Sequence, residues 1–357
     1  MVYIFVLSFC ALYFYAIQKI RVNILLFLPP FLIYFMISAL QYNVGADYPS
    51  YIYIYENQWV LERYFNSGEF FFYYANKILE YFRFPSQAIF FVFAFVQSLF
   101  IFIYFGVLKN KGYLLWLFFL FFFTVSSIYN NQLNGIRQYA ALTLLPLLTV
   151  FLFDKKYIYY VLGCFVATTF HSSGILFILF PLFILMNKVM GKYCFFLFMV
   201  TLPIYMFISK YAPTLLETFD LKYSSYIDSE YFEGGSYITV ITKLYYIPAL
   251  LFFYYIYDSK SCNSIGIKDE RYFSFLILVF SCTHWSFLMS LDIAILSRIA
   301  SYFWFFIIFP LYYVALALRR SNKVVFLIYI VYIVLPYIAK VTFLAKNEYL
   351  YKSYIFN

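Results

Sequence analysis

Long apolar runs alternate with short polar segments along the whole chain. Leu, Ile, Val and Phe dominate stretches of about 16–20 residues, which is the length that crosses the hydrocarbon core of a bilayer as an α-helix. Within lipid every backbone N–H and C=O needs an internal partner, so a spanning chain forms either helices or a closed barrel. Barrel strands alternate polar and apolar residues, and stretches such as Leu115–Phe123 do not. The pattern predicts an all-α, polytopic integral membrane protein.

The apolar runs define about twelve transmembrane helices. They fall at residues 2–17, 22–40, 87–106, 113–129, 137–153, 157–170, 174–187, 193–209, 237–257, 272–290, 300–318 and 324–340. Because the fifth to seventh runs are short and closely spaced, eleven helices fit the same pattern. No internal repeat or linker divides the chain, so we expect one transmembrane domain over residues 1–357.

Composition agrees with this class. Hydrophobic residues make up 65% of the 357 residues and charged residues 11%, which is too little charge to cover a soluble domain of this size. The 42 Tyr and 50 Phe residues are interpreted mainly as lipid-facing and packing residues, because Tyr also favours the membrane interface. A groove of rings that stack on sugars is the alternative interpretation.

Basic residues predict the orientation. The six short linkers after odd-numbered runs hold 14 of the 25 Lys and Arg residues, and positive residues favour the cytoplasmic side. This arrangement places both termini outside. The longest cytoplasmic linker, 258–271, is too short to form a nucleotide-binding domain, and the chain contains no phosphate-binding loop or dinucleotide fingerprint. The longer segments are on the outer face, at 41–86, 130–136, 210–236, 291–299 and 341–357. We therefore expect a substrate that is reached from outside and is attached to lipid.

The first candidate residue for chemistry is Asp47, in the segment that follows the second run. Gly45 permits a tight turn before it, and Tyr48 and Tyr51 follow it. The alternative is an ordinary Asx turn that starts an outer loop.

Arg137 opens the fifth run and is the second candidate. Its charge lies at the unfavourable end of the helix dipole and close to hydrocarbon, so we expect a partner for it. Asn134 and Gln138 flank it. The alternative is that Arg137 reaches a lipid phosphate at the membrane surface.

The two histidines have different surroundings in the sequence. His171 lies between two runs on the same predicted face as Asp47 and Arg137, which makes it a candidate base. His284 lies inside the tenth run and is interpreted as a polar group with satisfied hydrogen bonds. Near the eleventh run, Arg298 is a further candidate, and a local ion pair with Asp292 is its alternative.

Together these residues resemble the EpsG family of Wzy-like polysaccharide polymerases. Val44-Gly45-Ala46-Asp47-Tyr48 followed by Tyr51 is similar to the family signature Val-Gly-Thr-Asp-Tyr…Tyr. The other family motifs have counterparts in the right order along the chain: Arg137-Gln138 within Asn134–Ala141, His171-Ser172-Ser173, Arg298 with Tyr302-Phe303, and Asn347-Glu348-Tyr349 with Tyr354. Two positions depart from the family pattern. Gln41 stands where the family usually has Arg, and Ala46 replaces the usual Thr, so phosphate binding would fall to Arg137 and Arg298.

The resemblance implies a glycosyltransferase of the bacterial cytoplasmic membrane. Such polymerases transfer a glycan from undecaprenyl diphosphate, on the outer leaflet, to a sugar hydroxyl of another lipid-linked unit. It implies His171 or Asp47 as the catalytic base, and Arg137, Arg298, Asn134, Gln138, Tyr48, Tyr51 and Tyr302 as substrate-binding residues. Arginines would stabilise the leaving diphosphate, so neither a metal nor another cofactor is expected. A chain-length regulator and a flippase are possible partners, and nucleic acid is not expected.

Two other functions remain open. An O-antigen ligase-like transferase would use the same donor with a different acceptor. A flippase or transporter of lipid-linked glycans would carry charges along a path through the bilayer, whereas only Lys243 and His284 lie away from the ends of the predicted spans.

One outer segment has a helical pattern of its own. In residues 69–84, Asn76, Lys77, Glu80 and Arg83 recur at helical spacing beside a broad aromatic face. We predict an amphipathic helix that lies in the outer interface. The alternative is an additional element packed on the helix bundle.

Overall fold

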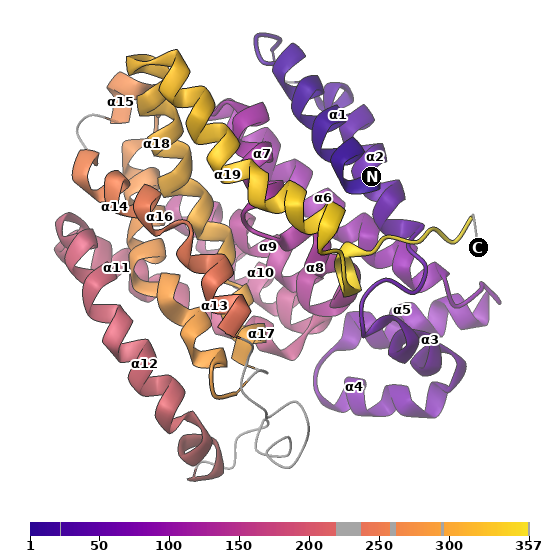
Figure 1. Ribbon diagram of the computed structural model, residues 1–357. Coiled ribbons are helices and arrows are strands. Elements are labelled where there is room, and N and C mark those ends of the chain that lie inside the picture. Colours follow the sequence, from indigo (N-terminus) through magenta and orange to yellow (C-terminus); the bar gives the residue numbers. More distant parts are fainter. Residues whose placement is uncertain (22, 219–236, 258–261, 294–295, 356–357) are drawn as a thin grey trace. The chain divides into compact units, whose positions relative to one another are not determined.

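A computed structural model describes residues 1–21, 23–218, 237–257, 262–293 and 296–355 (Figure 1). The described chain is helical, and in it the only β-type pairing is an isolated bridge between Gln41 and Ser353. The predicted all-α class is confirmed. Residues 219–236, which form most of the predicted outer segment 210–236, lie outside the described residues, as does the start of the linker 258–271.

The helices support the membrane assignment. By length and composition, six described segments could each cross a bilayer: Ala88–Asn110, Ile136–Phe153, Ser172–Tyr211, Glu270–Ser290, Trp304–Ser321 and Lys323–Phe343. Five shorter apolar helices are Val2–Ala16, Leu25–Ala39, Leu115–Thr124, Tyr157–Phe170 and Ile241–Ile256. The predicted runs coincide with these segments, two of them with Ser172–Tyr211. The exact number of twelve spans stays a prediction.

Contacts divide the chain into two compact units. The first comprises residues 1–181 and 331–357, and the second comprises residues 182–330. Two helices, α11 (Phe180–Met190) and α19 (Lys323–Phe343), contain the boundaries between them. These units are defined by contacts alone, so the prediction of one functional domain over 1–357 stays a prediction.

The first unit is built around α9 (Ile136–Phe153), almost all of whose side chains are buried. It packs between α6 (Ala88–Asn110) and α10 (Tyr157–Phe170), while α2 (Leu28–Ala39) packs on α6. Two further helices, α1 (Val2–Ala16) and α7 (Leu115–Thr124), pack on each other. Phenylalanine rings fill the space between these helices; Phe14, for example, contacts Phe102, Phe105 and Phe119. Many of the abundant aromatic residues therefore serve packing.

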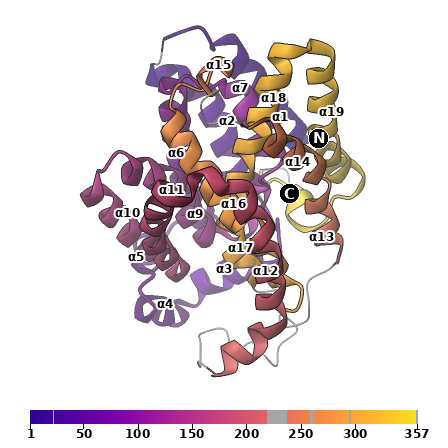
Figure 2. The same ribbon diagram turned by 90° about the vertical axis from the view of Figure 1, so that its left-hand side faces the viewer.

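The segment between α2 and α6 is largely helical. It forms α3 (Tyr48–Glu56), α4 (Glu62–Asn66) and α5 (Phe70–Tyr81), and both views show these helices gathered at one end of the first unit (Figures 1 and 2). The predicted helix within 69–84 is confirmed, and Glu80 and Arg83 of its predicted polar face are exposed, but the prediction is wrong for Asn76. Asn76 is fully buried, whereas Tyr74 and Ile78 are more than half exposed. The reason is that α5 packs against α6 and α10, and Asn76 Nδ2 donates to the Phe72 carbonyl of its own helix.

The C-terminal tail folds back beside the segment that follows α2. The backbone N–H of Tyr42 donates to the Lys352 carbonyl, and that of Tyr354 donates to the Leu40 carbonyl. The Tyr3 hydroxyl donates to the Glu348 carbonyl at 2.6 Å. Burial raises the pKa of the Glu348 carboxyl above its ordinary value. The tail motif is therefore part of the structure that holds the Asp47 segment.

The second unit contains two long helical segments, α12 (Cys194–Thr218) and α16 (Glu270–Thr283), which pack on each other. A 3-10 helix, His284–Ser290, continues α16. The shorter helices are α13 (Tyr237–Leu244), α14 (Ile247–Ile256), α15 (Cys262–Ile265), α17 (Ser297–Ser301) and α18 (Ile308–Ser321).

Candidate functional site

Arg137 forms an ion pair with Glu69. Arg137 is the second residue of α9, and its Nη1 donates to Glu69 Oε2. The two side chains are only 16% and 3% exposed. The expectation that this arginine needs a partner is confirmed, because a charge buried near hydrocarbon is costly unless an opposite charge compensates it.

Aromatic rings surround the same guanidinium. Its central carbon lies 4.4 Å from the ring centre of Tyr64, 4.8 Å from that of Phe72 and 5.7 Å from that of Tyr51. Such rings attract a cation through their electron-rich faces. Burial raises the pKa of Tyr51, and the charge of Arg137 partly opposes that rise. Arg137 Nε has no hydrogen-bond partner among the described residues, so the guanidinium retains a donor.

Glu69 also connects Arg137 to the segment that contains His171. Its second oxygen, Oε1, accepts a hydrogen bond from the backbone N–H of Ser172 at 3.1 Å. One carboxylate therefore joins the start of α9 to the turn that follows α10. This link brings two motifs that are 34 positions apart in the sequence into one polar cluster.

His171 is held at the junction between α10 and the 3-10 helix Ser172–Leu179. Its Nδ1 accepts from the Ser173 N–H at 3.3 Å and lies 2.6 Å from the Ser173 hydroxyl oxygen. The backbone contact suits an Nδ1 that accepts, whereas the shorter contact to the hydroxyl suits either tautomer of the ring. The side chain is partly exposed. The role of His171 as a base stays a prediction.

Asp47 approaches the same cluster through Asn134. The backbone N–H of Asp47 donates to Asn134 Oδ1 at 2.8 Å, and Asn134 Nδ2 lies 3.5 Å from Asp47 Oδ2. Asn134 ends α8 (Ile128–Asn134), three positions before Arg137. Gly45 makes this contact possible. Its φ is +80°, and an added Cβ would lie 2.4 Å from Asn134 Oδ1.

Four of the predicted substrate-binding residues are buried, and Tyr51 beside Arg137 is one of them. The Tyr48 hydroxyl donates to Gln87 Oε1 at 2.7 Å and its ring stacks on Phe90. Burial raises the pKa of Tyr48 to about 12. Gln138 on α9 and Tyr302 in the second unit are also buried. These positions suit residues that shape a site, and their contact with substrate stays a prediction.

Arg298 belongs to the second unit. It lies exposed on the short helix α17, six positions before the apolar segment Trp304–Ser321. Asp292, its suggested local partner, accepts a hydrogen bond from the Ser209 hydroxyl of α12.

Comparison with known proteins identifies the family. The family model described as "EpsG family" matches residues 24–356, which is nearly the whole chain. The chain belongs to the EpsG family. No curated protein and no solved structure matches it. The resemblance seen in the separate motifs is therefore confirmed over almost the full length.

In this EpsG-family chain the structure gathers five of the predicted residues in the first unit: Asp47, Tyr51, Asn134, Arg137 and His171. Their roles stay predictions. Among the described residues, no three His, Cys, Asp or Glu side chains are placed to hold one metal ion.

Glu69 is a residue of the cluster that the sequence pattern did not indicate. The residue begins the segment in which helical spacing was the dominant pattern, and it precedes a run of three phenylalanines. A lone carboxylate before an apolar run indicates a candidate ion pair, because a buried carboxylate needs a partner. The sequence offers several basic partners, however, and only the fold selects Arg137.

Proposed function

We propose that this EpsG-family protein polymerises lipid-linked oligosaccharide units on the outer face of the bacterial cytoplasmic membrane. The donor would be a glycan on undecaprenyl diphosphate, and the acceptor would be a sugar hydroxyl of a second lipid-linked unit. Family membership and the apolar helices support a membrane-bound, polysaccharide polymerase-like protein. The observation that carries the proposal is the polar cluster of Asp47, Arg137 and His171, which Glu69 and Asn134 hold together.

In the proposed reaction, the acceptor oxygen attacks the anomeric carbon of the donor glycan. The bond between that carbon and the diphosphate oxygen breaks. The hydroxyl proton must pass to a base, and the diphosphate leaves with the electron pair. We assign Asp47 as the base. Ser173 orients the ring of His171 through Nδ1, and we propose that His171 assists Asp47 by contacting the substrate. This assignment reverses the order expected from the sequence.

Positive charge would stabilise the departing diphosphate without a metal ion. Arg137 contributes its remaining donors, and Glu69 orients the guanidinium. Glu69 already neutralises part of the charge of Arg137. The sequence motif that contains Arg298 supports this residue as a further proposed phosphate contact. Asn134, Gln138 and Tyr51 would border the substrate, while Tyr48 would support the wall of the site. Tyr302 stays a substrate-binding residue proposed from its sequence motif.

The remaining parts of the proposal concern the membrane context. The density of basic residues in the alternate linkers supports termini on the outside. A flippase that delivers the units and a regulator of chain length are the proposed partners, in a single functional domain over residues 1–357.

The test replaces the proposed base. Asp47→Asn should reduce polymer formation by about 10²–10⁴-fold, because the amide cannot accept the hydroxyl proton. Polymer is measured as glycan ladders from cells that lack the endogenous protein, and from purified protein supplied with lipid-linked units. The matched control is Asp154→Asn, at the opposite end of α9, where Asp154 makes only a partly exposed ion pair with Lys156.

The outcomes separate the functions. Normal ladders from a well-expressed Asp47→Asn protein would contradict the proposed base. If wild-type protein adds one glycan to a different acceptor and makes no ladder from lipid-linked units, it is a ligase-like transferase. Movement of intact units across the bilayer without new glycosidic bonds would indicate a flippase.

A further inference from the structure

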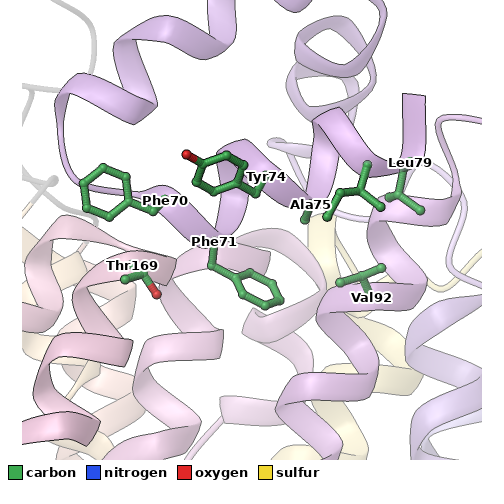
Figure 3. A pocket seen from close by; sticks show the side chains of 8 residues that line it. Phe70, Phe71, Tyr74, Ala75, Leu79, Val92 and Thr169 are labelled. Atoms are coloured by element: carbon green, nitrogen blue, oxygen red, sulfur yellow. The ribbon is translucent and has the colours of Figure 1, made fainter. Parts of the chain in front are cut away.

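An apolar groove of about 410 Å³ lies in the first unit, beside α5. Its lining comes from α5, from Val92 of α6 and from Thr169 of α10 (Figure 3). Phe70 and Thr169 lie at one end of the groove, and Leu79 and Val92 lie at the other (Figure 3). Its size falls in the range of ligand sites, and almost all of its wall is hydrocarbon.

One end of the groove adjoins the polar cluster. Phe70, which lines the groove, directly follows Glu69, and Thr169 comes two positions before His171. Side chains of the first turn of α5 contribute both to the groove and to the surroundings of Arg137. Phe71 lines the groove and packs on Phe170 with ring centres 4.6 Å apart, whereas Phe72 lies against the guanidinium of Arg137.

We propose that this groove binds the isoprenoid chain of the lipid-linked donor, next to its diphosphate. The inference rests on the proposed function. If the diphosphate lies at Arg137, the chain attached to it must leave the cluster along an apolar path. The groove provides such a path, because it begins at the residues that adjoin Glu69 and His171 and runs along α5 over aromatic and aliphatic side chains.

The experiment uses the full protein in lipid nanodiscs and a sugar-free probe. The probe is undecaprenyl diphosphate with a diazirine on its chain, and a phosphatidylglycerol with a diazirine on an acyl chain is the comparison probe. After irradiation, labelled peptides are identified by mass spectrometry. We expect the prenyl probe to label residues 70–79, 92 and 169, and unlabelled undecaprenyl diphosphate to suppress this label while phosphatidylglycerol does not.

A pair of matched variants locates the site. Val92→Trp fills the groove, whereas Val161→Trp places the same bulk on an exposed position of α10 that does not line it. Val92→Trp should reduce labelling of residues 70–79 about tenfold or more, and Val161→Trp should leave it unchanged. If Val92→Trp does not fold, the competition by unlabelled undecaprenyl diphosphate in wild-type protein still tests the proposal.

Three results would overturn the inference: equal labelling of the groove by the phospholipid probe, no competition by undecaprenyl diphosphate, or undiminished labelling in folded Val92→Trp protein. The first would show that the groove holds bulk membrane lipid. Because the probe carries no sugar, labelling does not depend on glycan transfer. Specific labelling without any ladder would leave the groove assignment intact and contradict the polymerase proposal alone.

Discussion

The two histidines of the chain lie in opposite kinds of surroundings. His171, in the first unit, ends a helix, is partly exposed, and is hydrogen-bonded at Nδ1 beside the Glu69–Arg137 pair. His284, in the second unit, is buried and lies against the rings of Phe198 and Trp285. Its Nε2 has no hydrogen-bond partner among the described residues, so the expectation that its hydrogen bonds are satisfied is wrong at that atom.

The contrast shows which polar groups of an apolar chain are candidates for chemistry. Burial alone does not distinguish a site, because His284 is the more buried ring. His171 differs in that Ser173 binds its Nδ1 and the backbone N–H of the next residue binds Glu69, the partner of Arg137. A group that reacts needs such a defined orientation and access to substrate. His284 is packed like an aromatic side chain.

The largest expected effect in this comparison is on His171. His171→Ala should lower polymer formation about 10²-fold, because the contact of the imidazole with the substrate is lost, while the protein remains in the membrane. Ser173→Ala removes the hydroxyl beside Nδ1 but keeps the ring, so its effect should be smaller. Ladder assays at matched protein levels measure both. Equal ladders from wild type and His171→Ala would place His171 outside the reaction.

The next effect concerns the ion pair beside His171. Glu69→Ala leaves the Arg137 charge buried without its carboxylate and should cost about 3–5 kcal/mol of stability. The control is Glu62→Ala, where the Tyr73 hydroxyl reaches an exposed carboxylate at 3.3 Å and little should change. Thermal unfolding in detergent compares the variants. In the Glu69→Ala/Arg137→Ala double variant the loss should be well below the sum of the single losses; simple additivity would contradict a coupled pair.

A smaller effect is expected at the turn before Asp47. Gly45 and Gly68 share nearly the same backbone conformation, with φ of +80° and +81°, but an added Cβ meets Asn134 only at Gly45. Gly68→Ala should cost about 1–2 kcal/mol for the left-handed backbone alone. Gly45→Ala should cost more and should also reduce polymer, because Asn134 must move away from Asp47. Equal unfolding temperatures and equal ladders for the two variants would show that the Asn134 contact has no consequence.

The smallest effect is expected at His284. His284→Phe replaces a ring with an unsatisfied nitrogen by a ring of similar shape, so stability should change by less than about 1 kcal/mol or rise slightly. Ladders should remain normal. A folded His284→Phe protein that made no polymer would remove the distinction between the two histidines.

Helix positions could be predicted because the lipid constrains the chain so strongly. An apolar run long enough to cross the bilayer has to satisfy its own backbone, and the predicted runs accordingly coincide with helices such as Ile136–Phe153 and Tyr157–Phe170. The requirement that Arg137 has a partner follows from the same argument. Segments that lie outside this constraint were less predictable: α3 was not anticipated, and Asn76 was assigned to the wrong face of α5.

What the sequence determined by itself was the membrane class, the family motifs and the residues whose charge required an explanation. Tertiary structure decided which groups meet. Glu69 pairs with Arg137 and binds the Ser172 N–H because α5 packs between α6 and α10, and that packing depends on contacts between residues far apart in the chain. Local patterns record how much of a helix is apolar. They do not indicate which neighbouring helix covers that apolar face. In an apolar chain several packings satisfy the same pattern, and a few buried charges determine which of them forms.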